Sequence, residues 1–242
     1  MASLTNLDPA TLKRRSFIYR KLAAAGAEFA EVNGGAVAMR YPPRAETEGA
    51  TARRMGLADL SVLPHCGLKG RGTVEWLAAQ GLTIGADSNK AYSQSGGELA
   101  ARLAPTEIFL LDSLQGTGRL VNQLAAAWQW AASTPRPQQG YPTPRQDSHA
   151  WFMVTGERSA EMFAKICGVD LRPRHCPVGT VAQTSVAKMS AIIVRADLGG
   201  TLAYHLLADI ASAEYLWTCV EDAAAEYDGG IVGLAALRSL QA

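Results

Sequence analysis

Apolar positions along the chain switch between a helical and an extended spacing. Apolar residues three and four positions apart predict amphipathic helices, whereas short apolar runs bounded by glycine, proline or asparagine predict strands. The helices expected on this basis cover about 16–26, 73–80, 118–132, 159–167 and 212–227. The expected strands are a hairpin over 29–39, followed by 57–69, 98–103, 108–112, 150–155, 181–194 and 201–207.

Three segments lack either spacing. Residues 44–54 are polar and alanine-rich, which suits a loop or a short helix, and residues 87–97 are rich in Asn, Ser and Gly and predict a loop. Four prolines fall within 134–145. Because proline removes a backbone donor, that stretch is expected to be an extended connector and not a helix or a central strand.

The order of the expected elements is repeated. Both halves read strand, helix, strand, strand, helix, and the helices bracketed by Gly70 and Gly81 and by Gly156 and Gly168 occupy matching places. The pattern predicts an α+β fold of two β-α-β-β-α repeats, with antiparallel sheets and helices packed on them. The expected divisions are a tail over 1–15, a first α+β half over 16–133, a proline-rich connector over 134–147 and a second α+β half over 148–242.

Composition narrows the classes of function. The chain has 242 residues, 48% of them hydrophobic, and a net charge of +1, so a nucleic-acid partner is not expected. No apolar run is long enough to cross a membrane, and the first 15 residues do not resemble a secretory signal. Four cysteines without a CxxC spacing are typical of buried thiols, so we expect a cytoplasmic protein.

The sequence contains few signs of a catalytic centre. The segment from Gly67 to Gly72 lacks both phosphate-loop patterns, no GxSxG is present, and the four histidines do not have the spacing of zinc ligands. The neighbouring acids Glu221 and Asp222 diverge on a helix, and Asp209 with Glu214 is the other pair of carboxylates. We expect no metal site and assign no catalytic residue; a cysteine with a distant histidine stays open, and cofactor-binding residues remain unknown.

Several segments together resemble the glycine-cleavage T-protein, or aminomethyltransferase-like, folate-binding superfamily. The resemblance spans roughly 15–240 and is carried by Gly56-Leu57-Ala58-Asp59-Leu60-Ser61, by the segments 15–29 and 35–41, by 213–217 and by 233–240. Within that superfamily, the segments 59–61, 67–70 and 182–187 are most similar to the gamma-subunit family of heterotetrameric sarcosine oxidases. The resemblance implies an aminomethyltransferase-like fold that lacks some elements.

Three positions depart from the T-protein pattern. The stretch that matches its aspartate-bearing "GGxxDD" strand is 96–101, where alanines stand at Ala100 and Ala101. The acidic turn matches 197–204 without reproducing its acids, and the folate-side arginine matches Leu237. Alanine and leucine can neither hydrogen-bond a pterin nor pair with a glutamyl tail, so the resemblance implies that this chain has no folate-dependent active site of its own.

The resemblance also implies partners and cofactors. It predicts a non-catalytic gamma-type subunit of a flavoenzyme that oxidatively demethylates an N-methyl amine or amino acid and passes the one-carbon unit to tetrahydrofolate. Alpha, beta and possibly delta subunits would be its partners and would carry FAD, FMN and NAD, with no cofactor in this chain. The alternatives are a stand-alone folate-dependent aminomethyl- or methyltransferase and a binding module for another ligand.

Overall fold

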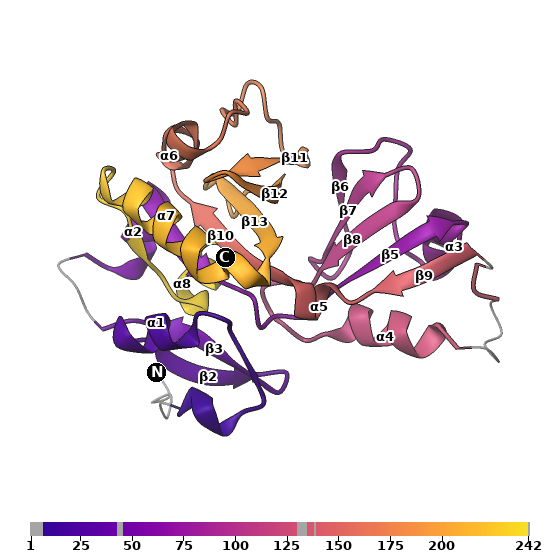
Figure 1. Ribbon diagram of the computed structural model, residues 1–242, viewed down its shortest axis with the longest axis horizontal. Coiled ribbons are helices and arrows are strands. Elements are labelled where there is room, and N and C mark those ends of the chain that lie inside the picture. Colours follow the sequence, from indigo (N-terminus) through magenta and orange to yellow (C-terminus); the bar gives the residue numbers. More distant parts are fainter. Residues whose placement is uncertain (1–6, 43–45, 130–134, 138, 242) are drawn as a thin grey trace.

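Three β-sheets carry the fold of the computed structural model, which describes residues 7–42, 46–129, 135–137 and 139–241 (Figure 1). Sheet A has the strand order β1 (Arg14–Arg15), β3 (Gly35–Arg40), β2 (Glu28–Val32). Sheet B has the order β11 (Val181–Val186), β12 (Met189–Arg195), β13 (Ala203–Asp209), β10 (His149–Thr155), β4 (Gly56–Asp59), β14 (Gly230–Ile231). Sheet C has the order β6 (Lys90–Ser93), β7 (Leu99–Ala104), β8 (Glu107–Leu111), β5 (His65–Arg71), β9 (Gln139–Thr143).

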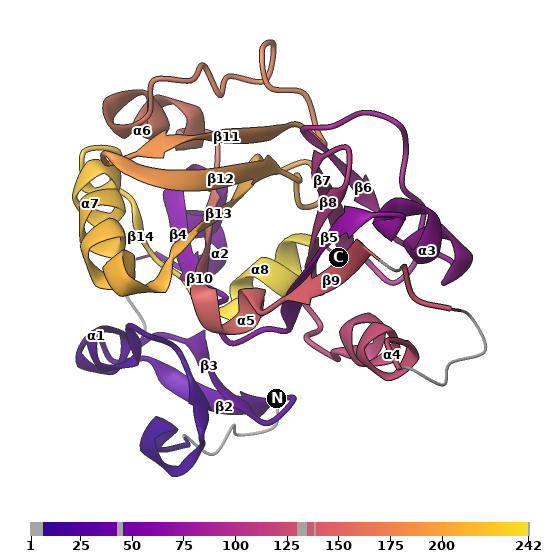
Figure 2. The same cartoon turned by 45° about the vertical axis from the view of Figure 1, so that its right-hand side comes forward.

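The helices lie around these sheets. In the view of Figure 2 sheet A lies below, sheet B lies above it, and sheet C lies to the right with α3 and α4 beyond it. The α-helices of the described residues are α1 (Tyr19–Ala24), α2 (Glu48–Met55), α3 (Thr73–Ala79), α4 (Arg119–Ala127), α5 (Arg145–Ser148), α6 (Ser159–Ile166), α7 (Ala213–Ala225) and α8 (Leu234–Gln241).

The predicted repeat is confirmed by the strand orders. In sheet C the chain runs β5, α3, β6, β7, β8 and builds the order β6-β7-β8-β5. In sheet B it runs β10, α6, β11, β12, β13 and builds the same order, β11-β12-β13-β10. The helices α4 and α7 then follow in matching places. The expected α+β class is therefore correct, with sheets that are mostly antiparallel.

One strand of this repeat lies where the sequence predicted a loop. β6 pairs with β7 in the antiparallel register Lys90↔Arg102 and forms an edge of sheet C. Of its four side chains only Ala91 is buried, so the strand has almost no apolar alternation. The prediction of a loop over 87–97 was therefore wrong for Lys90–Ser93 and correct for the residues on either side. Pairing with β7 forms this strand without an apolar alternation in its sequence.

The proline-rich segment is also paired. β9 runs antiparallel to β5 at the other edge of sheet C, with Pro142 opposite Leu68, and α5 follows it. An edge position tolerates proline because one side of the strand needs no ladder bonds. The segment is thus extended, as expected, but it belongs to a sheet. Positions 130–134 and 138 lie outside the described residues, including the end of the helix expected over 118–132; α4 ends at Ala127.

Serines stand near the starts of two helices, but neither caps its helix with its side chain. Ser16 Oγ accepts the N–H of Ile18 at 3.2 Å in the turn that precedes α1, which begins only at Tyr19. Ser212 precedes α7 but makes no side-chain cap. A short 3-10 turn, Ile210–Ser212, leads directly into α7, and the Asp209 side chain accepts the N–H of Ala211 at 2.8 Å instead. Asp209 therefore caps the turn that leads into α7.

The sheets cross the boundaries expected between the halves. β4, from the first half, pairs antiparallel with β10 and parallel with β14, so sheet B contains strands from both halves. β1 lies in the segment expected as a tail and pairs parallel with β3. Sheet pairing in sheet B therefore links strand β4 of the first half to the second half.

Sheet B is buried on both faces. Along β10 the side chains alternate between two apolar cores, with Ala150, Phe152 and Val154 in one, and Trp151 and Met153 in the other. The first core lies under α6 and α7. The second core also receives Ala101, Leu103, Phe109 and Leu111 of sheet C, so it joins the two sheets. A third core packs the opposite face of sheet C against α3 and α4.

No helix in the described part of the chain is both long and apolar enough to span a bilayer.

The turns before α3 and α6 contain glycines in matching places, and we predict that their substitution is costly. At Gly156, φ is +105° and a Cβ would lie 2.3 Å from the carbonyl of Arg54, a backbone group that cannot move aside. Gly156→Ala should lower the free energy of unfolding by about 3 kcal/mol or more, because the strained dihedral and a backbone clash add. Chemical denaturation of the purified protein measures this.

Gly200→Ala is the matched control. Its φ is +83°, but a Cβ there meets nothing within 4 Å. Backbone strain alone should therefore lower the free energy of unfolding, by about 1 kcal/mol. Equal losses at Gly156 and Gly200 would contradict the close approach of backbone at Gly156.

Candidate functional site

The glycine pair before β7 makes room for a carboxylate in the interior. A Cβ at Gly96 would lie 2.5 Å from Oε2 of Glu98, so the absence of a side chain there leaves the space that this carboxylate occupies. Gly97 has a φ of +86°, and a Cβ there would lie 3.4 Å from Cβ of Ser113. Only 2% of Glu98 is exposed. The stretch that resembles the aspartate-bearing strand of T-proteins therefore does hold a buried acid, but at position 98.

A second buried acid lies at the end of the neighbouring strand. Asp112 follows β8, is 3% exposed, and accepts the N–H of Gly118 at 2.7 Å through Oδ2. Burial raises the pKa of the Asp112 carboxyl, and the charge of Glu98 acts in the same direction. Hydrogen bonds from the backbone of Gly118 and Ser113 oppose this rise. Asp112 thus holds its proton to a higher pH than a solvated aspartate does.

The two carboxyl groups have few hydrogen-bond donors and cations near them. Oε2 of Glu98 and Oδ1 of Asp112 accept no hydrogen bond from any described residue. The nearest cation is Arg119, whose Nη2 lies 3.5 Å from Oε1 of Glu98 and whose side chain is 62% exposed. The apolar groove of about 220 Å³ between α4 and β5 is lined by other residues, so it does not open on the pair.

Two of the three departures from the T-protein pattern, at Ala100–Ala101 and at Leu237, lie in packed interior. Ala100 and Ala101 are fully buried on opposite faces of β7, in two different apolar cores. Leu237 of α8 is fully buried in the core that joins sheets B and C. Its neighbour Arg238 donates to the carbonyls of Leu114 and Gln115, at 2.9 and 3.1 Å, and so fixes the loop that follows Asp112. These positions contribute packing and loop support rather than polar groups to a ligand.

The segment 59–61, which carries much of the resemblance, forms a buried polar cluster. Ser61 Oγ donates to Oδ1 of Asp59 at 2.6 Å and accepts the N–H of Trp151 at 3.0 Å, which links β4 to β10. Ser16 also hydrogen-bonds the Asp59 carboxylate. Burial raises the pKa of Asp59, while these hydrogen bonds lower it. The cluster is used within the chain, where it ties the segment before α1 to sheet B.

The histidines occupy separate places and different states. His205 is buried, accepts the N–H of the Trp151 indole at 2.9 Å, and has its pKa lowered to about 3 by burial. Burial and the Arg145 charge lower the pKa of His149 to about 4, and burial also lowers the pKa of His65. His175 is exposed and lies 3.6 Å from Asp170. The first three are therefore neutral at pH 7.

One serine–histidine pair was not identified from the sequence. Ser148 Oγ lies 2.8 Å from Nδ1 of His149 at the end of α5, and Nη1 of Arg145 lies 3.2 Å from Nε2. Arg145 also pairs with Glu107 at 2.6 Å. A general base needs a carboxylate or carbonyl on its second nitrogen, whereas a cation there weakens its basicity. The pair therefore has the contacts of a structural cluster at the edge of sheet C.

The cysteines and the side chains that could bind a metal ion are the remaining candidates. Burial raises the pKa of the Cys66 thiol to about 12 and raises that of Cys176 as well, so neither is disposed to form a thiolate. Within the described ranges, no three His, Cys, Asp or Glu side chains lie close enough together to hold a metal ion. Of the carboxylate pairs considered from sequence, Glu221 lies 3.9 Å from Lys21, and Asp222 is exposed.

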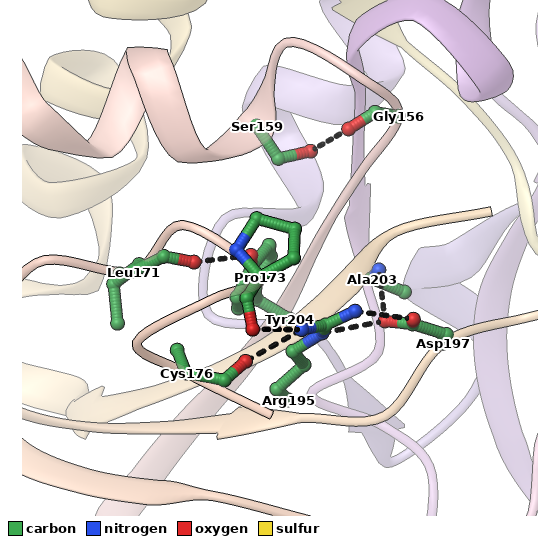
Figure 3. Close-up of polar contacts among 9 residues, drawn as sticks. All are labelled: Gly156, Ser159, Leu171, Pro173, Cys176, Arg195, Asp197, Ala203 and Tyr204. Atoms are coloured by element: carbon green, nitrogen blue, oxygen red, sulfur yellow. Dashed lines mark hydrogen bonds and ion pairs between the residues drawn. The ribbon is translucent and has the colours of Figure 1, made fainter. Parts of the chain in front are cut away.

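The most complete polar cluster surrounds Arg195 (Figure 3). Its Nε and Nη2 donate to Oδ1 and Oδ2 of Asp197 at 3.0 and 2.7 Å, and its Nη1 donates to the carbonyl of Cys176 at 2.6 Å. The acidic turn matched in sequence thus has its one aspartate bound to an arginine of the same chain. A second neighbour, Tyr204, donates its hydroxyl to the carbonyl of Leu171 at 2.6 Å. Together they fix the segment between α6 and β11.

The carboxylate pair generates a prediction about stability and pH. Asp112→Asn keeps an acceptor for Gly118 N–H and removes a buried charge that Glu98 repels. Because the raised pKa of Asp112 favours folding at low pH and that contribution is lost as pH rises through the folded-state pKa, the gain should be greatest at neutral pH. We expect Tm to rise by roughly 2–4 °C at pH 7, the equivalent of about 1 kcal/mol for a chain of this size, and to change less at pH 4.

Asp87→Asn is the control for this substitution. Asp87 is exposed and lies 3.6 Å from Lys90, so its loss should leave Tm nearly unchanged at both pH values. A lower Tm for Asp112→Asn at pH 7 would show that the Asp112 carboxylate is compensated and that this description of the pair is wrong.

Comparison with known proteins places these features in a family. A model of the GCVT N-terminal domain family matches residues 99–242, more than half of the chain. No curated protein matches the chain significantly. Of the solved structures, aminomethyltransferase T of the glycine cleavage system from Bartonella henselae is 19% identical with a TM-score of 0.68, over 94% of this chain and 62% of that one. This chain therefore spans less than two thirds of that protein.

A second solved structure matches over nearly its whole length. It is one chain of a heterotetrameric sarcosine oxidase from Corynebacterium sp. U-96 in complex with pyrrole 2-carboxylate. That chain is 21% identical with a TM-score of 0.60, and the match covers 91% of this chain and 99% of that one. At these identities the two likenesses establish the fold, and the family match covers the strands, loops and helices described above from β7 onward. The chain therefore belongs to the GCVT N-terminal domain family.

Proposed function

We propose that this chain is a non-catalytic, gamma-type subunit of a heteromeric, sarcosine oxidase-like flavoenzyme. In that assembly, alpha and beta subunits, and possibly a delta subunit, would carry FAD, FMN and NAD and would oxidatively demethylate an N-methyl amine or amino acid. Tetrahydrofolate would accept the one-carbon unit in a partner subunit. This chain would support the assembly without holding a cofactor.

The observation that carries the proposal is the extent of the structural match. The chain aligns with 99% of one chain from a heterotetrameric sarcosine oxidase, whereas it aligns with 62% of an aminomethyltransferase. In the length of chain that it covers, this protein therefore corresponds better to a subunit of a larger oxidase than to a complete transferase.

The interior between sheets B and C gives independent support. In this region Phe109 and Leu111 of β8 pack in one core with Trp151 and Met153 of β10, together with Leu237. A pterin needs hydrogen-bond partners and space, and this core offers apolar contacts. The nearby acids Glu98 and Asp112 are buried among residues of their own chain. A scaffolding role fits such an interior better than folate chemistry does.

A scaffolding subunit has a physical use in this reaction class. Oxidation of an N-methyl amine generates an iminium ion or formaldehyde, either of which reacts with water or with protein when it escapes. A protein wall beside the route between two active sites excludes water and confines such an intermediate. A rigid α+β scaffold, with both faces of its central sheet buried, can form such a wall.

One observation favours a second candidate, a stand-alone folate-dependent aminomethyl- or methyltransferase. The TM-score with the aminomethyltransferase, 0.68, exceeds that with the sarcosine oxidase, 0.60. That candidate requires polar groups in the region between the sheets, where Ala101 and Leu237 lie in the apolar core. We therefore prefer the subunit role.

Affinity purification from the native source tests the proposal. A tagged form of this chain should recover larger chains in fixed stoichiometry, with bound flavin visible by absorbance and with N-demethylase activity towards an N-methyl amino acid. Omitting this chain when the other subunits are co-expressed should reduce assembly or activity, because a wall or support is missing. Recovery of the chain alone, as a monomer without flavin-containing partners, would rule the subunit role out.

A further inference from the structure

The segment 168–179, here called the docking loop, projects from the protein between α6 and β11. In Figure 1 it rises above sheet B at the upper edge of the view, and Figure 2 shows it running along the outer side of that sheet. It has no regular helix or strand, yet its backbone is held at several points. His175 and Cys176 both donate their N–H groups to the carbonyl of Arg172 at 2.9 Å, which closes a turn.

A buried guanidinium anchors this loop from below. Arg195, which is 7% exposed, donates to the carbonyl of Cys176 at 2.6 Å and lies 3.4 Å from that of Pro173, while Asp197 holds its other nitrogens (Figure 3). The N–H of Gly179 donates to the carbonyl of Arg195 at 2.9 Å. Leu171 and Cys176 point inward and are buried. An arginine and its aspartate are thus used to fix the backbone of a surface loop.

The outer side of the docking loop exposes apolar side chains among its charged ones. Val178 is 60% exposed and Val169 is 39% exposed, and these are two of the few large apolar side chains that the described residues expose. Pro173 and Pro177 are exposed beside them. An open groove of about 610 Å³ continues from the loop along α6 towards Tyr227. The loop therefore offers exposed apolar side chains close to a depression, a combination that suits a contact surface.

The loop contains one acidic residue, Asp170, and the basic residues Arg172, Arg174 and His175. Asp170 is bound by Arg172 at 2.5 Å, and the Arg172 charge is neutralised there. Arg174 is exposed, and within the described part of the chain no carboxylate pairs with it. His175 is exposed as well. On neighbouring α6 the charged residues are already paired, Glu161 with Arg158 and Lys165 with Glu226. The unmatched charge at this surface is thus the Arg174 guanidinium.

We infer that the docking loop is a preformed contact by which this chain binds another subunit of the oxidase, on a face of that subunit with an apolar depression rimmed by carboxylates. This inference rests on the proposed function. Carboxylates are expected because they pair with Arg174 in two-point geometry. A depression is expected because Val169 and Val178 stabilise a complex only when the partner removes their side chains from water.

The fixed backbone explains why such a loop binds well. Association costs free energy for every segment that it orders, and a loop held in advance by Arg195 and Tyr204 avoids that cost. The same rigidity would be unnecessary for a loop that served only to connect α6 with β11.

Two substitutions at the loop surface test the inference in the assembled enzyme. Val178→Asp places a charge in the apolar contact, and Arg174→Glu reverses the charge that meets the carboxylate rim. Each should weaken binding of this chain to the purified flavin-containing subunits by about tenfold or more in Kd. Arg174→Glu should also reduce the salt dependence of binding. Neither side chain is buried, so Tm of the isolated chain should not change.

Lys188→Glu is the matched control, since it makes the same charge change on an exposed residue at the opposite end of β11 and should bind as the wild type does. If wild type and both loop variants bind the flavin subunits equally, the loop inference is wrong and the proposed function stands. If the wild type does not bind them at all, both fail. Self-association of the chain that depends on Val178 would assign the loop to a second copy and overturn the inference.

Discussion

Burial of sheet B on both faces is the constraint on which the rest of the structure depends. Side chains of β10 alternate between two apolar cores, so helices α6 and α7 must cover one face, and sheet C with α8 must cover the other. The second core fills the region between the two sheets with residues such as Phe109, Trp151 and Leu237. What joins the two repeats is therefore a dry contact, and buried polar groups such as Asp59 and Ser61 are satisfied within it.

Much of the fold follows from patterns in the sequence. The repeated element order expected from the sequence is found in the structure, where sheets B and C repeat one strand order and glycines with positive φ lie before both α3 and α6. The failures have physical causes. β6 is an edge strand with one buried side chain, and β9 contains Pro142, so neither shows an apolar alternation. The pairing of β4 with β10 is a long-range contact that no local pattern encodes.

The candidate site was less accessible to sequence reasoning. Resemblance identified the positions of Ala100, Ala101 and Leu237, which the structure places in packed cores. It gave no sign of the buried Glu98–Asp112 pair. These acids lie fourteen positions apart in the sequence, and the pairing of β7 with β8 brings them together. The Gly96–Gly97 pair beside Glu98 was the one available signal. The anchoring of 168–179 by Arg195 likewise depends on tertiary contacts.

These observations describe a member of the GCVT N-terminal domain family whose interior is filled by apolar packing and whose loop 168–179 is fixed by Arg195. We propose that this chain supports an assembly and does not itself bind folate. Calorimetric titration of tetrahydrofolate into the isolated chain, with an active aminomethyltransferase as the positive control, tests it most directly. The account predicts no measurable binding under conditions in which the transferase binds. Stoichiometric, saturable binding of tetrahydrofolate by this chain would contradict it.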